Sequence, residues 1–179
     1  YKTDKESSIV HNNLKDMKDV LTYSLQYQKG AWVLHMLRNY VGEDNFRKGI
    51  RNYYKKYYNS TTTTNQFKTE MEVVSGMNLD TFFDQWLYKG GNMVLDGNWK
   101  FDEKKGRIEV NLNQVQNDGY LFEMPVELGI SYNDKNLEKI QTVKLEKEKG
   151  RFYIASDSKP ISIKIDPNTK LLAIWDFNE

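Results

Sequence analysis

The sequence predicts an α+β protein in two segregated parts, an all-α helical subdomain followed by an antiparallel β-sandwich. Apolar residues before Gly90-Gly91 recur mostly at helical spacing, whereas those after it fall into short alternating segments. We therefore expect two domains, residues 1–91 and residues 92–179. The 179 residues include 13% aromatic side chains, enough for a real hydrophobic core.

Composition excludes several classes of function. The chain has 26 basic and 25 acidic residues, a net charge of +1, which argues against a nucleic-acid partner. It has no cysteine, so disulfides and thiolate chemistry are absent. No apolar run approaches the roughly 20 residues of a transmembrane helix, so no membrane-spanning segment is expected. These features leave the compartment unknown.

Metal-binding patterns are also missing. The two histidines, His11 and His35, lie far apart in the sequence, whereas an H-E-x-x-H zinc site needs two histidines four positions apart. The cysteine-based zinc frameworks are excluded with the cysteines. We therefore expect no metal ligand in this chain.

Four helices are expected in the first part, besides a short one at Asn13–Thr22. The strongest covers about Gln28–Val41, and Gly42 supplies its left-handed stop. The second starts at Glu43-Asp44, acids that suit the positive end of a helix dipole. Gly49 inside the second helix indicates close packing against another helix.

The third helix has recognisable ends. Thr63 followed by Gln66 fits a capping box, in which each side chain bonds the backbone of the other residue, and Gly76 ends the helix. The fourth helix stops at Gly90-Gly91. Its apolar positions are Leu79, Phe82, Phe83, Trp86 and Leu87.

The run Tyr53–Tyr58 interleaves four tyrosines with Lys55 and Lys56. Some single-strand nucleic-acid binders combine aromatic and basic residues in this way. At helical spacing, however, the run divides into a core face and a solvated face. We favour this structural interpretation.

About seven short strands are expected in the second part. Ile108, Val110 and Leu112 alternate with polar residues, and Asp102–Gly106 is a polar turn before them, so residues 98–101 and 107–113 should form a hairpin. Short strands with regular turns predict an antiparallel β-sandwich. The other expected strands are residues 122–132, 140–145, 151–155, 161–165 and 171–175.

Tyr27 precedes the strongest helix, a position that holds a hydroxyl clear of the helix body. A phenol with a pKa near 10 stays protonated at neutral pH and donates a hydrogen bond. Aimed at a developing oxyanion, such a donor contributes roughly 3 kcal/mol to transition-state stabilisation. Position alone does not distinguish this role from that of a structural tyrosine, because the chain has 12 tyrosines.

The segment Tyr27–Arg38, YQKGAWVLHMLR, resembles the Y-x-K-G-A-x-V-L-x-M-L-R segment of the M1 family of zinc aminopeptidases. The resemblance covers about residues 20–91 and continues loosely through the strands. Two positions depart from it, Gln66 where Asp is usual and Met93 where Pro is usual. Further segments resemble the family motifs G-E-x-x-F, T-x-x-D-F, S-G-x-D-L, F-F and Q-W-L, namely Gly42–Phe46, Thr63–Phe67, Ser75–Leu79, Phe82-Phe83 and Gln85–Leu87.

This resemblance implies that residues 1–91 are the helical C-terminal half of a thermolysin-like peptidase domain and residues 92–179 its β-sandwich domain. The family's zinc ligands and general-base Glu match nothing in this sequence. Zinc is therefore expected in the parent protein and not in this fragment. By the match to Y-x-K-G, Tyr27 is the catalytic residue, which donates to the tetrahedral intermediate opposite the zinc. No substrate-binding residue is assigned.

The sequence thus predicts a fragment of a zinc-dependent aminopeptidase that hydrolyses N-terminal residues from peptides. The rest of the catalytic domain would lie N-terminal to Tyr1, and the isolated fragment would be inactive. One alternative is a non-catalytic protein-binding or scaffold module derived from the same fold, for which Gln66 and Met93 leave room. Another is an unrelated helical module joined to a binding sandwich. Substrate preference, oligomeric state and any domain after Glu179 stay open.

Overall fold

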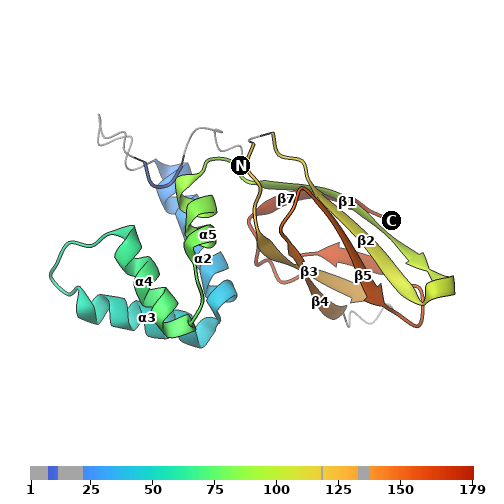
Figure 1. Ribbon diagram of the computed structural model, residues 1–179, viewed down its shortest axis with the longest axis horizontal. Coiled ribbons are helices and arrows are strands. Elements are labelled where there is room, and N and C mark those ends of the chain that lie inside the picture. The colour runs from blue at the N-terminus through green and yellow to red at the C-terminus, as the bar shows by residue number, and fades with distance from the viewer. Residues whose placement is uncertain (1–7, 12–21, 118, 133–137) are drawn as a thin grey trace. The chain divides into compact units, whose positions relative to one another are not determined.

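The chain divides into two compact units, Tyr1–Gly90 and Gly91–Glu179. The computed structural model describes residues 8–11, 22–117, 119–132 and 138–179. Within them, the first unit holds the helices and the second holds the strands and one 3₁₀ turn (Figure 1). The predicted α+β class, with helices and sheets in separate parts of the chain, is confirmed. Residues 13–21 of the short helix expected at Asn13–Thr22 lie outside the described residues.

The first described helix begins at Tyr23 rather than near Gln28. A π-helical turn, η1 (Tyr23–Lys29), runs directly into α2 (Gly30–Val41). Thr22 precedes it in an extended conformation. The Thr22 N–H and hydroxyl both donate to Gln26 Oε1, at 3.0 and 2.6 Å. Tyr27 therefore lies inside a helical turn and not before one.

Two helices pack closely at a glycine. Gly49 on α3 (Glu43–Lys56) is buried against α4 (Thr64–Ser75). A Cβ atom added at Gly49 would lie 2.5 Å from Met71 Sδ and 3.2 Å from Val74 Cγ2. Met71 is fully buried, so it has little room to move. The close helix packing predicted from Gly49 is confirmed.

The predicted capping box opens α4. Thr63 Oγ1 accepts a hydrogen bond from the Gln66 N–H at 3.4 Å, and Gln66 Oε1 accepts one from the Thr63 N–H at 2.8 Å. Gly76 ends the helix in the left-handed conformation, with φ of 69°. Gln66 is thus a structural cap, and a Gln or Glu is the side chain that this position of a capping box requires.

The fourth predicted helix is present, but its second half is a π-helix. It consists of α5 (Asp80–Phe83) followed by η2 (Asp84–Tyr88). In the described part of the chain, every helix is too short or too polar to cross a bilayer. The core of this unit is built from Leu25, Val33, Met36, Leu37, Val41, Met71, Leu79, Phe82, Phe83 and Trp86.

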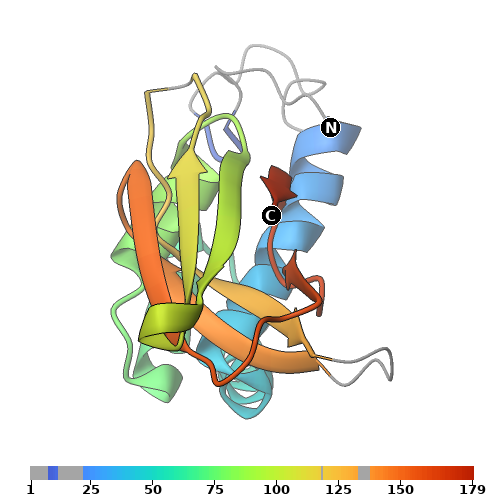
Figure 2. The ribbon, with the colours of Figure 1, turned by 90° about the vertical axis from the view of Figure 1, so that its right-hand side faces the viewer.

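The described part of the second unit contains seven strands in two sheets, which form the predicted sandwich (Figure 1). One sheet has the order β5-β2-β1-β7 and the other β4-β3-β6. The predicted hairpin of β1 and β2 is confirmed, and the short turn η3 (Glu103–Lys105) closes it (Figure 2). The strands are β1 (Met93–Asp102), β2 (Arg107–Gln114), β3 (Met124–Ser131), β4 (Glu138–Leu145), β5 (Lys149–Ala155), β6 (Ser162–Ile165) and β7 (Ala173–Asn178).

One ladder differs from the antiparallel prediction. β1 and β7 run parallel, with Met93 opposite Ala173 and Asn98 opposite Asn178. The other four ladders are antiparallel. The apolar alternation of a strand shows which face is buried but carries no information about the direction of its neighbour. The parallel pairing of β1 with β7 could therefore not be predicted from local sequence patterns.

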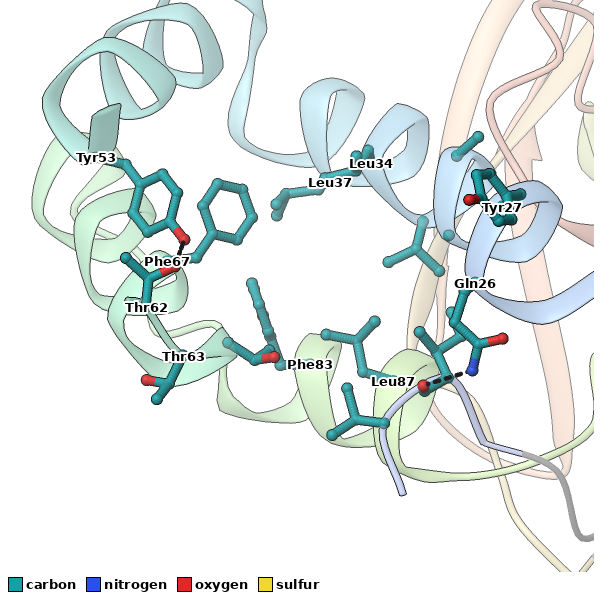
Figure 3. A pocket seen from close by; sticks show the side chains of 16 residues that line it. Gln26, Tyr27, Leu34, Leu37, Tyr53, Thr62, Thr63, Phe67, Phe83 and Leu87 are labelled. Carbon is teal, nitrogen blue, oxygen red and sulfur yellow. Dashed lines mark hydrogen bonds between the residues drawn. The ribbon is translucent and has the colours of Figure 1, made fainter. Parts of the chain in front are cut away.

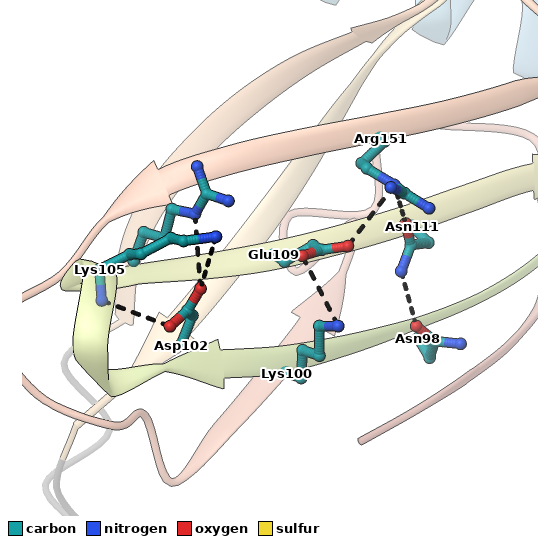
Figure 4. A network of polar contacts seen from close by, with 8 residues as sticks. Asn98, Lys100, Asp102, Lys105, Glu109, Asn111 and Arg151 are labelled. Carbon is teal, nitrogen blue, oxygen red and sulfur yellow. Dashed lines mark hydrogen bonds and ion pairs between the residues drawn. The ribbon is translucent and has the colours of Figure 1, made fainter.

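A row of polar side chains crosses the outer face of β1, β2 and β5 (Figure 4). Glu109 is only 9% exposed, and its carboxylate lies 3.7 Å from Lys100 Nζ and 3.5 Å from Arg151 Nε. Asn111 donates to Asn98 at 2.9 Å and accepts from Arg151 at 3.1 Å. Cross-strand pairs of this kind contribute roughly 0.2–1 kcal/mol each. They therefore help to set the register of the three strands.

Two carboxylates hold the turn after β6. Asp166 is buried and accepts from the N–H groups of Lys170 and Leu171, at 2.8 and 2.9 Å. Glu127 on β3 accepts from Lys170 Nζ at 2.6 Å and Asn168 Nδ2 at 2.8 Å. Partial burial acts to raise the pKa of the Glu127 carboxyl. The hydrogen bonds from Lys170 and Asn168 outweigh it and hold the pKa below its ordinary value of 4.5.

Replacing Gly49 with valine should destabilise the helical unit by about 1–3 kcal/mol, because the branched side chain must displace Met71 or Val74. The free energy is measured by urea unfolding followed by far-ultraviolet circular dichroism. The control is Lys48→Val at the exposed neighbouring position, which should change stability by no more than about 0.5 kcal/mol. Equal effects of the two substitutions would contradict close packing at Gly49.

The lowered pKa of Glu127 predicts acid sensitivity of the β unit. Its stabilising effect is present above the ordinary pKa of 4.5 and is lost as the pH falls through the lower folded-state pKa. Glu127→Gln should therefore reduce the loss of stability on acidification. Urea unfolding at a series of pH values, followed by the amide NMR signals of β3, measures it. The exposed control Glu103→Gln should behave like the wild type, and an unaltered pH dependence in Glu127→Gln would refute the prediction.

Candidate active-site wall

Tyr27 presents its side chain outward from η1. The residue is 58% exposed, and its ring stacks on Tyr23 one turn earlier, with the centroids 6.2 Å apart. Within the described residues, the Tyr27 hydroxyl makes no hydrogen bond. It is therefore a donor available to an acceptor from outside this part of the chain.

The opposite side of η1 is anchored in the core. Leu25 is 8% exposed and Lys29 only 2%. A lysine in the first turn of a helix beginning near Gln28 would be solvated, but the helix begins earlier and Lys29 is buried. A π-helical turn is wider than an α-helical one, so it changes which side chains face the core. Such turns occur often at functional sites, where they re-aim a side chain.

Gln26 ties this turn to two other segments. Its Oε1 accepts from Thr22, and its Nε2 donates to the Ile9 carbonyl at 3.2 Å. Val10, which follows Ile9, donates its N–H to the carbonyl of Leu87 at 2.9 Å. Leu87 lies at the end of the fourth helix. Sequence reasoning did not identify Gln26. The only local signal was the polar pair Thr22 and Gln26 at i, i+4 spacing.

A groove of about 550 Å³ opens beside Tyr27 (Figure 3). This volume lies within the range of small-molecule pockets, roughly 300–1,000 Å³. Tyr27 and Gln26 lie at one end, and Tyr53 hydrogen-bonds Thr62 at the other, 2.5 Å between their oxygens. The described lining consists of Ile9, Val10, Gln26, Tyr27, Gly30, Ala31, Val33, Leu34, Leu37, Tyr53, Thr62, Thr63, Thr64, Phe67, Phe83 and Leu87.

The chemistry of this lining is limited. Its described side chains are apolar or neutral and include no carboxylate, ammonium, guanidinium or imidazole group. The described lining therefore holds no side chain suited to act as a general base. What the wall offers is apolar surface and hydroxyl donors, of which Tyr27 is exposed and lacks a partner among the described residues.

A metal site would require several ligating side chains close together. The described residues contain no group of three or more His, Asp or Glu side chains placed to hold a metal ion. His35 lies beside Trp32, in an edge-to-face contact with centroids 5.5 Å apart, and its Nε2 lies 3.2 Å from Asn39 Nδ2. The described side chains thus do not fit a zinc ion, whose ligands would have to come from outside them.

Comparison with known proteins identifies relatives. Residues 2–86 match the Peptidase family M1 domain. "Probable aminopeptidase 2" of Sulfurisphaera tokodaii is 31% identical over 142 residues, which cover 79% of this chain and 17% of that protein. "Leucyl aminopeptidase" of Saccharolobus solfataricus is 25% identical over 171 residues, which cover 93% of this chain and 20% of that protein.

The fold has a close counterpart among solved structures. Legionella pneumophila aminopeptidase A, crystallised in complex with aspartic acid, matches 98% of this chain with a TM-score of 0.82 and 15% sequence identity. This chain covers 20% of that structure. The similarity shows that the fold is shared.

Sequence motifs, family match and relatives therefore agree. The motifs beginning at Tyr27 occur in the order and spacing of the family, and the matched proteins are aminopeptidases. The chain spans no more than 20% of the length of the relatives named above. Residues 2–86 of this chain belong to the peptidase family M1 domain.

Proposed function

We propose that this chain is part of a zinc-dependent aminopeptidase that hydrolyses N-terminal residues from peptides. It would contribute Tyr27 and part of the cleft wall, but not the zinc ligands. Residues 1–91 would be the helical C-terminal half of the catalytic domain and residues 92–179 its β-sandwich domain. The rest of the catalytic domain, N-terminal to Tyr1, would supply the zinc ligands and the general base. The match of residues 2–86 to the peptidase family M1 domain supports this assignment.

The exposed hydroxyl of Tyr27 is the observation that carries the proposal. Attack of water on a peptide carbonyl puts negative charge on the carbonyl oxygen. A neutral phenol aimed at that oxygen donates a hydrogen bond that is stronger in the transition state than in the ground state. Tyr27 is 58% exposed and has no competing acceptor among the described residues. Its part in the reaction is donation, without transfer of a proton.

The environment of Tyr27 favours a fixed geometry. The Tyr27 carbonyl accepts from the Gly30 N–H, and its ring stacks on Tyr23. Gln26 fixes the preceding turn through Thr22 and Ile9. A donor held in place before the reaction loses little free energy to reorganisation at the transition state. These contacts support a positioned donor in preference to a mobile surface tyrosine.

The two departures from the family motifs do not favour the scaffold alternative. Gln66 completes the capping box of α4. Met93 is fully buried on β1, in the core of the β unit. Each therefore has a structural role in its own unit, and neither lines the groove beside Tyr27.

Substitution of Tyr27 by phenylalanine in the full-length enzyme should lower kcat/KM by about 100-fold or more, mainly through kcat. The ring stays and only the donor is lost. The assay uses aminoacyl-amide substrates at equal zinc occupancy. Tyr88→Phe, an exposed tyrosine outside the groove, is the matched control and should keep wild-type activity. Unchanged kinetics in Tyr27→Phe would make Tyr27 structural.

The purified 179-residue chain should bind no stoichiometric zinc and hydrolyse no peptide, because its sequence lacks the family's zinc ligands and general base. Metal analysis after dialysis against zinc, with a peptidase assay on the same sample, measures both properties. One zinc ion per chain together with turnover would contradict the assignment of the metal to another part of the enzyme.

A further inference from the structure

An exposed row of large side chains runs along the C-terminal half of α3 and into the turn that follows it. Ile50, Tyr54 and Tyr58 follow one another at four-residue spacing, and they are 38%, 66% and 63% exposed. The rings of Tyr54 and Tyr58 meet edge to face, with centroids 5.7 Å apart. We call these three residues the α3 ridge.

The α3 ridge is distinct from the core face of the same helix. Tyr53 packs against Tyr57 and Phe67, with centroids 5.4 and 5.2 Å away. Gly49 faces Met71 on α4. The sequence interpretation of Tyr53–Tyr58 as a core face and a solvated face is confirmed, but the solvated face holds two of the four tyrosines. The ridge also lies outside the groove beside Tyr27, whose described lining includes none of its residues.

Three exposed cations belong to the same helix. Lys48, Arg51 and Lys55 make no ion pair with any described acid; we call them the α3 cations. Other basic groups nearby are paired, since Arg47 bonds Glu43 and Lys56 Nζ lies 2.6 Å from Glu70 Oε1. The exposed surface of α3 therefore combines large apolar and aromatic side chains with an excess of positive charge over Asp44, its one acid without an ion pair to a described residue.

The spacing of the α3 ridge and the charge of the α3 cations together favour a helical partner with acidic residues. Ile50 and Tyr54 lie one turn apart on α3, and side chains at this spacing fit the groove of another helix. Tyr58, in the turn after α3, extends the row through its ring contact with Tyr54. The α3 cations would pair with acidic residues that flank such a partner's apolar stripe. A second copy of this chain would bring like charges together, which is unfavourable. Nucleic-acid binders present parallel stacking platforms and strongly basic surfaces, whereas these rings meet edge to face and the net charge is +1.

We propose that the α3 ridge and the α3 cations form a docking surface for an acidic amphipathic helix of a partner protein. The ridge would supply the apolar contact and the cations its specificity. This surface is independent of the hydroxyl of Tyr27, so the inference stands whether or not the chain contributes to catalysis.

The test uses a labelled helical peptide with a leucine stripe flanked by glutamates, and fluorescence anisotropy with the 179-residue chain. Two comparison peptides have the same residues scrambled or lysines in place of the glutamates. The acidic helix should bind at least about tenfold more tightly than either. Its binding should weaken as salt rises.

Variants locate the site. Tyr54→Ser combined with Tyr58→Ser should weaken binding of the acidic helix by about tenfold or more. Arg51→Glu should weaken binding and reduce its salt dependence. Tyr153→Ser and Lys104→Glu, exposed positions in the β unit, are the controls and should bind like the wild type. Circular dichroism confirms that each variant keeps its helices.

Several results would overturn the proposal. One is equal binding of the acidic and scrambled peptides, and another is undiminished binding by the Tyr54→Ser, Tyr58→Ser variant. Tighter binding of single-stranded oligothymidylate than of the acidic helix would indicate a nucleic-acid surface instead. A concentration-dependent dimer, lost in the same double variant, would indicate that a second copy occupies the ridge.

Discussion

The side-chain amide of Gln26 is the interaction on which the candidate site depends. The amide accepts a hydrogen bond from Thr22, at the start of η1, and donates one to the Ile9 carbonyl. It thereby joins η1 to the segment of Ile9 and Val10, and Val10 in turn donates to the Leu87 carbonyl. A buried or half-buried amide left without its partners costs about 1–3 kcal/mol, so these bonds define one arrangement of the three segments. That arrangement turns Leu25 and Lys29 inward and Tyr27 outward.

In the proposed enzyme, this chain and the rest of the catalytic domain would supply different catalytic groups. The groove beside Tyr27 offers apolar surface and a hydroxyl donor but no ionisable base in its described lining. Peptide hydrolysis needs an activated water on one side of the carbonyl and charge stabilisation on the other. In the proposed enzyme, Tyr27 would supply only the second function, for which an exposed hydroxyl donor is sufficient.

Local signals accounted for much of the fold, because they report short-range bonds. The roles of three such features depend on neighbours on the same or the next helix, and local patterns predicted them. They are Gly49, the capping pair Thr63 and Gln66, and Gly76. Non-local features were missed. The parallel ladder of β1 and β7 joins segments far apart in the chain, and the burial of Lys29 depends on a π-helical turn that leaves no periodic trace. Only the resemblance to a family motif singled out Tyr27 among the tyrosines. The exposure of the Tyr27 side chain follows from the folded turn and could not be predicted from the local sequence.

A crystal structure of the full-length enzyme with a phosphinic peptide, which mimics the tetrahedral intermediate, tests the central claim most directly. The account predicts that Tyr27 Oη lies about 2.7–3.1 Å from a phosphinate oxygen, at hydrogen-bonding distance. It also predicts that the Gln26 bonds to Thr22 and Ile9 are kept. A Tyr27 hydroxyl turned away from the phosphinate, with another donor in its place, would contradict the account.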